Sequence, residues 1–174
     1  VAELIVACLA VVSVAGWNAR GLGTRVGISV DRTGILSLGS AMGLYVLILY
    51  GSYMVGLGYG ASCATWPLCQ GSVLPSGAPY MVHMLHRLMA VVVGVIIVTT
   101  SVSVCRKNEK RLSVRWTAGL LVAMFVAQMF VGATTVWATF TPLMKSIHLS
   151  LATLVWLASS VLGGLLVVPR VLDS

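Results

Sequence analysis

Four apolar stretches, each about as long as a membrane-spanning helix, limit what this chain can fold into. They cover residues 34–58, 81–104, 116–137 and 147–168. A helix of roughly 20 apolar residues crosses the ~30 Å hydrocarbon core of a bilayer. Only 9% of the residues are charged, against about 25% in soluble domains. The sequence therefore predicts an all-α, polytopic integral membrane protein.

The positions of the basic residues predict how these helices are oriented. The net charge is +7, and the basic residues are concentrated at 18–33, at 106–115 and at Arg170. Such an excess is typical of the cytoplasmic loops of membrane proteins, and it argues against a nucleic-acid partner. We expect these regions and the C-terminus in the cytoplasm, the loops 59–80 and 138–146 outside it, and a bacterial-type plasma membrane.

The same pattern divides the chain into three parts. Residues 1–33 hold a partial transmembrane helix and a cytoplasmic loop, residues 34–168 form the four-helix transmembrane domain, and residues 169–174 form a cytoplasmic tail. No charged segment precedes the apolar residues 1–17, so they do not resemble a signal peptide. We interpret them as the end of a spanning helix.

A weak internal repeat groups the four helices into two hairpins. In each hairpin, the second helix has a histidine followed four residues later by an alanine: His86 with Ala90, and His148 with Ala152. The first helices carry the related segments Gly51-Ser-Tyr-Met-Val55 and Gly132-Ala-Thr-Thr-Val136. Two similar hairpins predict a four-helix bundle with a pseudo-two-fold axis along the membrane normal.

His86 and His148 are the main candidates for chemistry. Both lie in the first turns of predicted helices that enter from the same side, so topology places them at a similar depth. Ionisable groups inside spanning segments are costly and are functional candidates, and imidazole is a standard axial ligand of haem iron. Ala90 and Ala152 would leave room for a flat macrocycle. The alternative is that each histidine only hydrogen-bonds within the bundle; we predict haem ligation.

Three other polar side chains lie on the same side of the predicted membrane. His83 is an alternative ligand, a proton-transfer group or an interfacial residue facing water. Arg87 either pairs with haem propionates, because a guanidinium offers paired donors to carboxylates, or extends to lipid headgroups. For Lys145 we favour the lipid headgroups.

Carboxylates are absent from the neighbourhood of the predicted site. The four in the chain lie in the partial span or on the predicted cytoplasmic side: Glu3, Asp31, Glu109 and Asp173. If the site needs a general base, His83 is the candidate. Gln128, in the middle of the third helix, hydrogen-bonds either to a neighbouring helix or to a cofactor, and we favour the neighbouring helix.

Cys63 and Cys69 bracket a short proline-containing segment of the loop 59–80. Compartments outside the cytoplasm are usually oxidising, so we predict a disulfide between them. The bond is either purely structural or exchanges with a thiol partner.

Several of these segments, in this order, resemble the haem A synthase family (COX15/CtaA). The resemblance covers about residues 34–168, and its most specific part is Cys-x-x-Trp-Pro-Leu-Cys followed by His-Arg. The matching segments are Gly51-Ser-Tyr-Met-Val55, Ser62-Cys-Ala-Thr-Trp-Pro-Leu-Cys-Gln-Gly71, His83-Met-Leu-His-Arg-Leu-Met-Ala90, Gln128-Met-Phe-Val-Gly-Ala-Thr-Thr-Val136, Pro142 and His148-Leu-Ser-Leu-Ala152.

The resemblance implies a function and a set of partners. Family members usually have two four-helix halves: one holds haem B through two histidines, and the other handles haem O, whose methyl group is oxidised to a formyl group. Carried over by position, His86 and His148 are the ligand pair, and Cys63 and Cys69 are a loop pair that helps haem or electron handling. His83 stands where the substrate-handling half commonly has a glutamate. The chain therefore looks more like a cofactor-binding C-terminal half, or a half-size member.

Three functions follow as hypotheses. The first is a haem A synthase-type oxidoreductase, or its cofactor-binding half, in which bis-histidine haem B relays electrons for the oxidation of haem O. The second is a membrane haem-binding electron-transfer module without its own oxidation chemistry, and the third is a quinone-linked thiol oxidoreductase using Cys63 and Cys69. The expected partners are haem O, haem O synthase, a quinol or thiol electron donor and the lipid bilayer, with a homo-oligomer as an alternative to a monomer.

Overall fold

The computed structural model describes residue 13 and residues 31–107 and 111–167. The predicted partial span over residues 1–17 and the predicted tail over 169–174 lie outside this range, residue 13 apart. Nearly all of the described chain is helical, and it contains no β-strand beyond one isolated bridge between Cys69 and Ser72.

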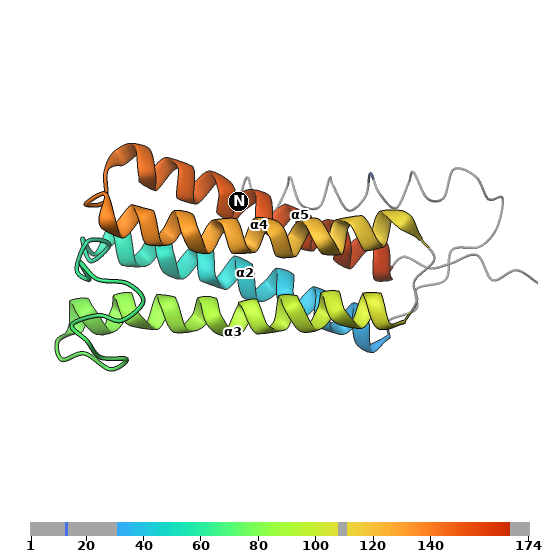
Figure 1. Ribbon diagram of the computed structural model, residues 1–174, viewed down its shortest axis with the longest axis horizontal. Coiled ribbons are helices and arrows are strands. Elements are labelled where there is room, and N and C mark those ends of the chain that lie inside the picture. The colour runs from blue at the N-terminus through green and yellow to red at the C-terminus, as the bar shows by residue number, and fades with distance from the viewer. Residues whose placement is uncertain (1–12, 14–30, 108–110, 168–174) are drawn as a thin grey trace, which may run out of the picture. The chain divides into compact units, whose positions relative to one another are not determined.

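Four long helices follow one another in the described chain (Figure 1). At ~1.5 Å rise per residue, even the 25 residues of α2 extend about 37 Å, which is more than the thickness of a hydrocarbon core. Each helix is long and apolar enough to cross a membrane, so the predicted all-α fold with four spans is confirmed. The helices are α2 (Arg32–Gly56), α3 (Ala78–Arg106), α4 (Leu112–Trp137) and α5 (Pro142–Val167).

Large apolar side chains cover the outer faces of these helices. Soluble monomers rarely expose a contiguous apolar surface of more than a few hundred Å², whereas lipid solvates such a surface at no cost. The protein is therefore an integral membrane protein. Among the most exposed of these side chains are Met42, Val92, Leu120, Phe130 and Leu154.

The helices begin earlier than the sequence predicted, and local capping explains why. Asp31 precedes α2 and accepts a hydrogen bond from the backbone N–H of Gly34 at 2.8 Å, as an N-cap residue does. Pro142, which we placed in a loop, is the first residue of α5, a position that tolerates proline because its N–H would have no partner there. The prediction that His86 and His148 lie in the first turns of their helices is therefore wrong: each lies about two turns in.

The contacts group the chain into two compact units, and all four helices contribute to each. Within the described residues, unit 1 comprises residues 13, 31–42, 96–107, 111–122 and 156–167, and unit 2 comprises residues 43–95 and 123–155. In unit 1, small polar side chains join neighbouring helices. The hydroxyls of Ser40 and Thr100 are 3.4 Å apart, and Ser101 donates to the carbonyl of Ala118 at 3.2 Å.

An ion pair joins the start of α2 to the residue that follows α3 in unit 1. The Lys107 ammonium lies 2.6 Å from the Asp31 carboxylate, and this hydrogen bond, helped by the Gly34 N–H, holds the pKa of Asp31 below its usual value. A lowered folded-state pKa contributes stability that is present at neutral pH and is lost as the pH falls through the folded-state pKa. The contribution is small because both side chains are about half exposed.

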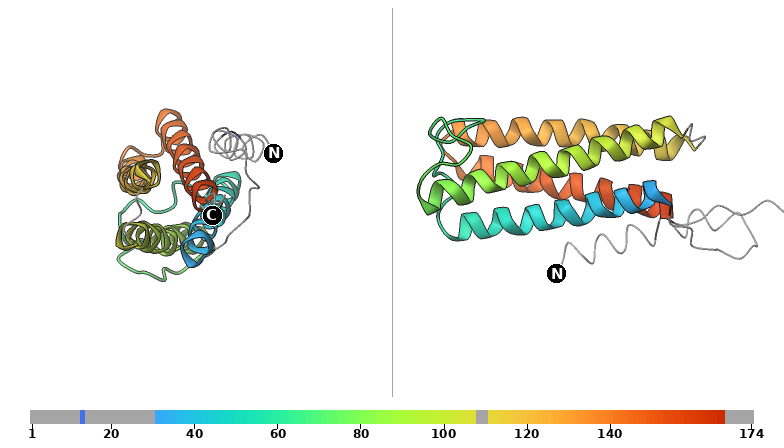
Figure 2. Two further views of the ribbon diagram at one scale, coloured as in Figure 1. Left: turned by 90° about the vertical axis from the view of Figure 1, so that its right-hand side faces the viewer. Right: turned by 90° about the horizontal axis from the view of Figure 1, so that it is seen from below.

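In unit 2, glycines allow two helix pairs to approach closely. A Cβ atom on Gly43 of α2 would lie 3.1 Å from the Val93 side chain of α3, and one on Gly94 of α3 would lie 2.7 Å from the Phe125 ring of α4. The two connections of unit 2, residues 57–77 and 138–141, lie at the same end of this unit (Figure 2).

The Gly94 contact generates a test of this packing. We expect Gly94→Ala to destabilise the protein by about 1–3 kcal/mol, because the added methyl group overlaps a ring that is itself buried. The matched control is Gly119→Ala in α4, where no described atom lies within 4 Å of the new Cβ. Thermal unfolding in detergent, followed by tryptophan fluorescence, measures both variants, and equal midpoints for the two would contradict the packing.

Candidate functional site

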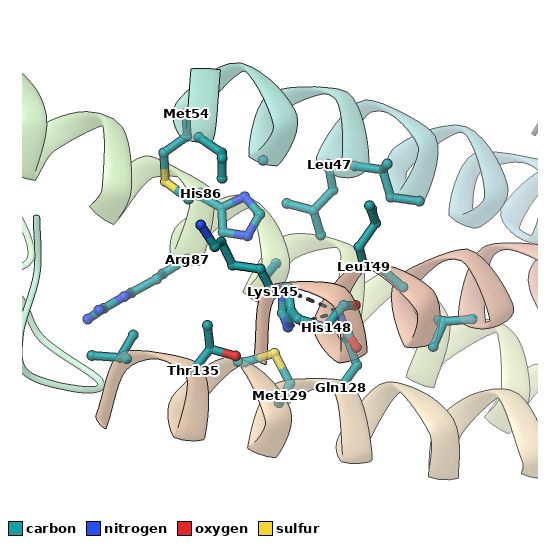
Figure 3. A pocket seen from close by; sticks show the side chains of 18 of the residues that line it. Leu47, Met54, His86, Arg87, Gln128, Met129, Thr135, Lys145, His148 and Leu149 are labelled. Carbon is teal, nitrogen blue, oxygen red and sulfur yellow. Dashed lines mark hydrogen bonds between the residues drawn. The ribbon is translucent and has the colours of Figure 1, made fainter. Parts of the chain in front are cut away.

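Unit 2 contains a partly open cavity of about 420 Å³, within the size range of small-molecule and cofactor sites. All four helices and the loop 57–77 contribute to its walls, and most of the wall is apolar. The polar side chains that reach it come from every helix (Figure 3): Ser52, His86, Arg87, Gln128, Thr135, Lys145 and His148.

His86 enters the cavity from α3 and lies against the backbone of α2. A Cβ atom on Gly51 would lie 3.1 Å from Cε1 of the His86 ring, so a larger residue there would require the imidazole to shift by a few tenths of an ångström. The Tyr50 ring is nearly parallel to the imidazole, with a centroid distance of 6.4 Å. His86 Nδ1 is buried and has no hydrogen-bond partner. A buried polar atom without a partner is costly, and a metal ion or a donor on a ligand would satisfy it.

His148 enters from α5 and repeats this arrangement. A Cβ atom on Gly132 of α4 would lie 3.2 Å from Cε1 of the His148 ring. The segments Gly51–Val55 and Gly132–Val136, which the sequence identified only as a repeat, therefore supply the glycine against which each histidine ring packs. The structure brings both members of the predicted ligand pair to one cavity. Their ligation of iron stays a prediction.

Gln128 holds His148 from the neighbouring helix. Its side-chain Nε2 donates to the His148 backbone carbonyl at 3.0 Å and lies 3.2 and 3.3 Å from the two ring nitrogens. The predicted helix–helix hydrogen bond of Gln128 is thus confirmed. The Oε1 atom of the same amide is buried without a partner.

The residues present fit a haem. Ala90 and Ala152 both line the cavity, as predicted, so a small side chain lies about one turn along each helix from its histidine. The orphaned His86 Nδ1, the apolar walls and the two cations at the cavity, Arg87 and Lys145, match a flat apolar macrocycle that carries iron and carboxylates. No group of three or more His, Cys, Asp or Glu side chains is gathered in the described residues, so the histidine pair is the candidate metal-binding feature there.

Arg87 anchors the cysteine-containing loop. Its Nη1 donates to the backbone carbonyls of Thr65, Pro67 and Leu68 at 2.8, 2.9 and 3.2 Å. The guanidinium, with Arg87 only 9% exposed, points away from the two histidines in Figure 3. The alternative in which Arg87 extends to lipid headgroups does not match these contacts. Pairing of Arg87 with haem propionates stays a prediction, although its donors already serve the loop.

His83 lies beneath the same loop and does not line the cavity. Its Nδ1 is 3.4 Å from the backbone nitrogen of Cys63, and its Nε2 is 3.4 Å from Nη2 of Arg87. A neutral imidazole has a single acceptor nitrogen, so it accepts from only one of these two donors. The side chain is 4% exposed, so the alternative in which it faces water is wrong: the loop covers it. Its role as a general base is untested.

A disulfide joins Cys63 and Cys69 across this loop. The two cysteines are 2% and 0% exposed and pack with Met84 of α3 into a small buried cluster. Trp66 and Pro67, between the cysteines, contribute to the cavity wall. The disulfide therefore shapes the segment that closes one side of the site.

The sequence missed two contributors to the cavity. Lys145, which we assigned to lipid headgroups, lines it from the first turn of α5. Trp66 lines it as well, although its position inside the cysteine pair was visible in the sequence. Neither assignment could be made from spacing, because both residues reach the cavity only through the folding of a connection.

Arg87→Met tests the anchoring role. Loss of the guanidinium leaves three loop carbonyls without their charged donor. Charge-assisted hydrogen bonds of this kind contribute about 1.5–3 kcal/mol. We expect amide hydrogen exchange to quicken in residues 61–76, with little change in α4. Arg115→Met, which removes an exposed arginine of α4, is the matched control. Unchanged exchange in the loop of the Arg87 variant would rule out the anchor.

Comparison with known proteins places this site in a family. The family model described as cytochrome oxidase assembly protein, COX15-CtaA, matches residues 2–160. A haem A synthase of Shouchella clausii is 29% identical over 128 residues, covering 72% of this chain and 42% of that protein. A haem A synthase of Symbiobacterium thermophilum is 30% identical over 119 residues, covering 68% and 39%.

A second group of relatives carries a different name. Protoheme IX farnesyltransferase 1 of Natronomonas pharaonis is 35% identical over 101 residues, covering 58% of this chain and 21% of that protein. The chain thus spans less than half the length of these curated relatives. Because the family model matches most of its residues, the chain belongs to the cytochrome oxidase assembly protein family COX15-CtaA.

Proposed function

We propose that this chain is the cofactor-holding part of a haem A synthase-type oxidoreductase. In this proposal His86 and His148 would hold a haem B. The bound haem serves the oxidation of the methyl group of haem O to a formyl group. The coarser part of this role, haem-related chemistry in a membrane protein, is supported by relatives named haem A synthase and protoheme IX farnesyltransferase.

One observation carries the proposal. Two histidines from two similar hairpins line the same apolar cavity, and each ring lies against a glycine of its partner helix. A histidine that only hydrogen-bonds within a bundle does not need such a glycine. If His86 had only that role, its buried Nδ1 atom would have a hydrogen-bond partner, and it has none. An open cavity between two imidazoles is what bis-histidine ligation requires.

When bound, the haem supplies reversible one-electron transfer at iron. The protein's own residues supply the rest. His86 and His148 would hold the cofactor, Gln128 fixes the position of His148, and the mostly apolar walls match the apolar faces of the macrocycle. Arg87 holds the segment that contains Trp66 and Pro67 as part of the wall.

The second candidate function is an electron-transfer module without its own oxidation chemistry. A specific observation favours it: residues 43–95 and 123–155 contain no aspartate or glutamate. The cavity therefore has no carboxylate to accept a proton from a substrate, and His83 lies outside its wall. In this version the haem O-oxidising residues belong to another part of the protein or to a partner.

The third candidate, a thiol oxidoreductase that uses Cys63 and Cys69, receives less support. Thiol–disulfide exchange requires a thiolate to reach one of the two sulfur atoms. Here both cysteines are covered by the loop and by α3. The burial favours a structural disulfide that keeps the loop in place.

The partners follow from the same proposal. Haem O would come from a haem O synthase, and a quinol or a thiol would be the electron donor. The loop 57–77 would lie on the extracytoplasmic side of a bacterial-type plasma membrane, with the C-terminus in the cytoplasm. A homo-oligomer is an alternative to a monomer.

Alanine variants of the histidines test the proposal. We expect the protein purified in detergent to show a reduced haemochrome spectrum of low-spin, bis-histidine haem. His86→Ala and His148→Ala should each lose the low-spin spectrum, because one axial ligand is removed. His83→Ala should keep it, because that ring does not line the cavity. Absence of haem from the wild-type protein, or an unchanged spectrum in both cavity variants, would sink the assignment.

Coexpression with a source of haem O then separates the first two functions. Formation of haem A that depends on His86 and His148 supports the oxidoreductase. Bound haem B without haem A, under conditions in which haem O is present, favours the electron-transfer module.

A further inference from the structure

Lys145, which we assigned to lipid headgroups from the sequence, lines the cavity. It lies in the first turn of α5, and its side chain reaches into the cavity that the two imidazoles line (Figure 3). Its ammonium lies 5.2 Å from the centroid of the Phe140 ring, and Phe140 also lines the cavity. The ring itself packs tightly on Gly60 of the loop 57–77. These contacts fix the amine at the cavity wall.

The described residues provide no carboxylate for this ammonium. The one acidic side chain in residues 31–107 and 111–167 is that of Asp31, which pairs with Lys107. Unit 2 contains two cations, Arg87 and Lys145, and no acid. A cation at an apolar wall is costly unless an anion pairs with it.

The donors of Arg87 are already in use and are not available to a ligand. Its guanidinium already donates to three loop carbonyls, and Nη2 lies beside His83. Lys145 is therefore the cation of the cavity that is available to a ligand. A ligand that fits would be largely apolar, to match the walls, and would carry a carboxylate within reach of the first turn of α5.

We propose that Lys145 is a binding residue that pairs with a propionate carboxylate of the porphyrin held between His86 and His148. The inference rests on the proposed function, and it adds the residue that recognises the propionate side of the porphyrin. An ammonium is a compact donor that can follow a flexible propionate. Esterification of the ligand should therefore remove the contribution of Lys145.

The test compares ferric protoporphyrin IX with its dimethyl ester, which has the same ring and iron but no carboxylate. Both are titrated into the haem-depleted full chain in detergent, and the Kd is read from the Soret band. We expect the wild-type protein to bind the free acid about tenfold more tightly than the ester, the effect of one charge-assisted pair. In the Lys145→Met variant, the ratio of the ester's Kd to the free acid's Kd should fall to near one. The Kd of the ester itself should equal that of the wild type.

Two variants serve as controls. Lys145→Arg keeps the positive charge and should restore most of the ratio. Arg115→Met removes the same charge from an exposed position of α4 and should leave the ratio unchanged. The second control excludes an effect of net charge.

The outcomes separate this inference from the function on which it rests. If neither porphyrin binds, or if binding survives both His86→Ala and His148→Ala, the proposed function fails and the inference fails with it. If binding needs the histidines but Lys145→Met keeps the wild-type ratio, only the inference is overturned. The titration is repeated in nanodiscs of zwitterionic lipid with and without an anionic phospholipid. If Lys145 affects only the dependence on anionic lipid, its partner is a headgroup phosphate and the inference is likewise overturned.

Discussion

The close approach of two helix pairs at Gly51 and Gly132 is the constraint on which the site depends. Each glycine lets an imidazole from the second helix of its hairpin lie directly against the backbone of the first. A methyl group at either position would come within 3.1 or 3.2 Å of a ring carbon, so the ring or the helix would have to move. Because the two contacts are equivalent, the two rings reach one cavity from two hairpins.

The loop 57–77 closes this cavity by a different interaction. Arg87 donates to three of its backbone carbonyls, those of Thr65, Pro67 and Leu68, and the last of these also accepts from the Thr65 hydroxyl. The arginine is adjacent in sequence to His86, so the same helix turn presents a ring to the cavity and a guanidinium to its cover. The disulfide and His83 complete the underside of that cover.

The distribution of charge in unit 2 follows from the same arrangement. Two cations and no acid surround an apolar space. Arg87 is neutralised by carbonyl dipoles, whereas Lys145 rests on the face of an aromatic ring, which attracts a cation only weakly compared with a carboxylate. The site is thus electrostatically complementary to an apolar acid, a property that belongs to the assembled unit and to no single helix.

The sequence by itself determined the class of fold, the four helices, the pair of histidines and the glycine-containing repeat. Hydrophobic length and the rarity of charge suffice for spanning helices, and an ionisable residue inside a span stands out against its apolar neighbours. The sequence also placed Ala90 and Ala152 beside the histidines, since helical spacing fixes which residues share a face.

Only the tertiary structure decided what the remaining polar residues contact. Periodicity says which face a residue occupies, but not which segment of a connection folds over that face. Arg87 and His83 proved to serve the loop, and Lys145 turned to the cavity because the short connection 138–141 positions the start of α5. The contacts of Arg87 and His83 with the loop join residues about 20 positions apart through irregular backbone, and no repeat in the sequence encodes them.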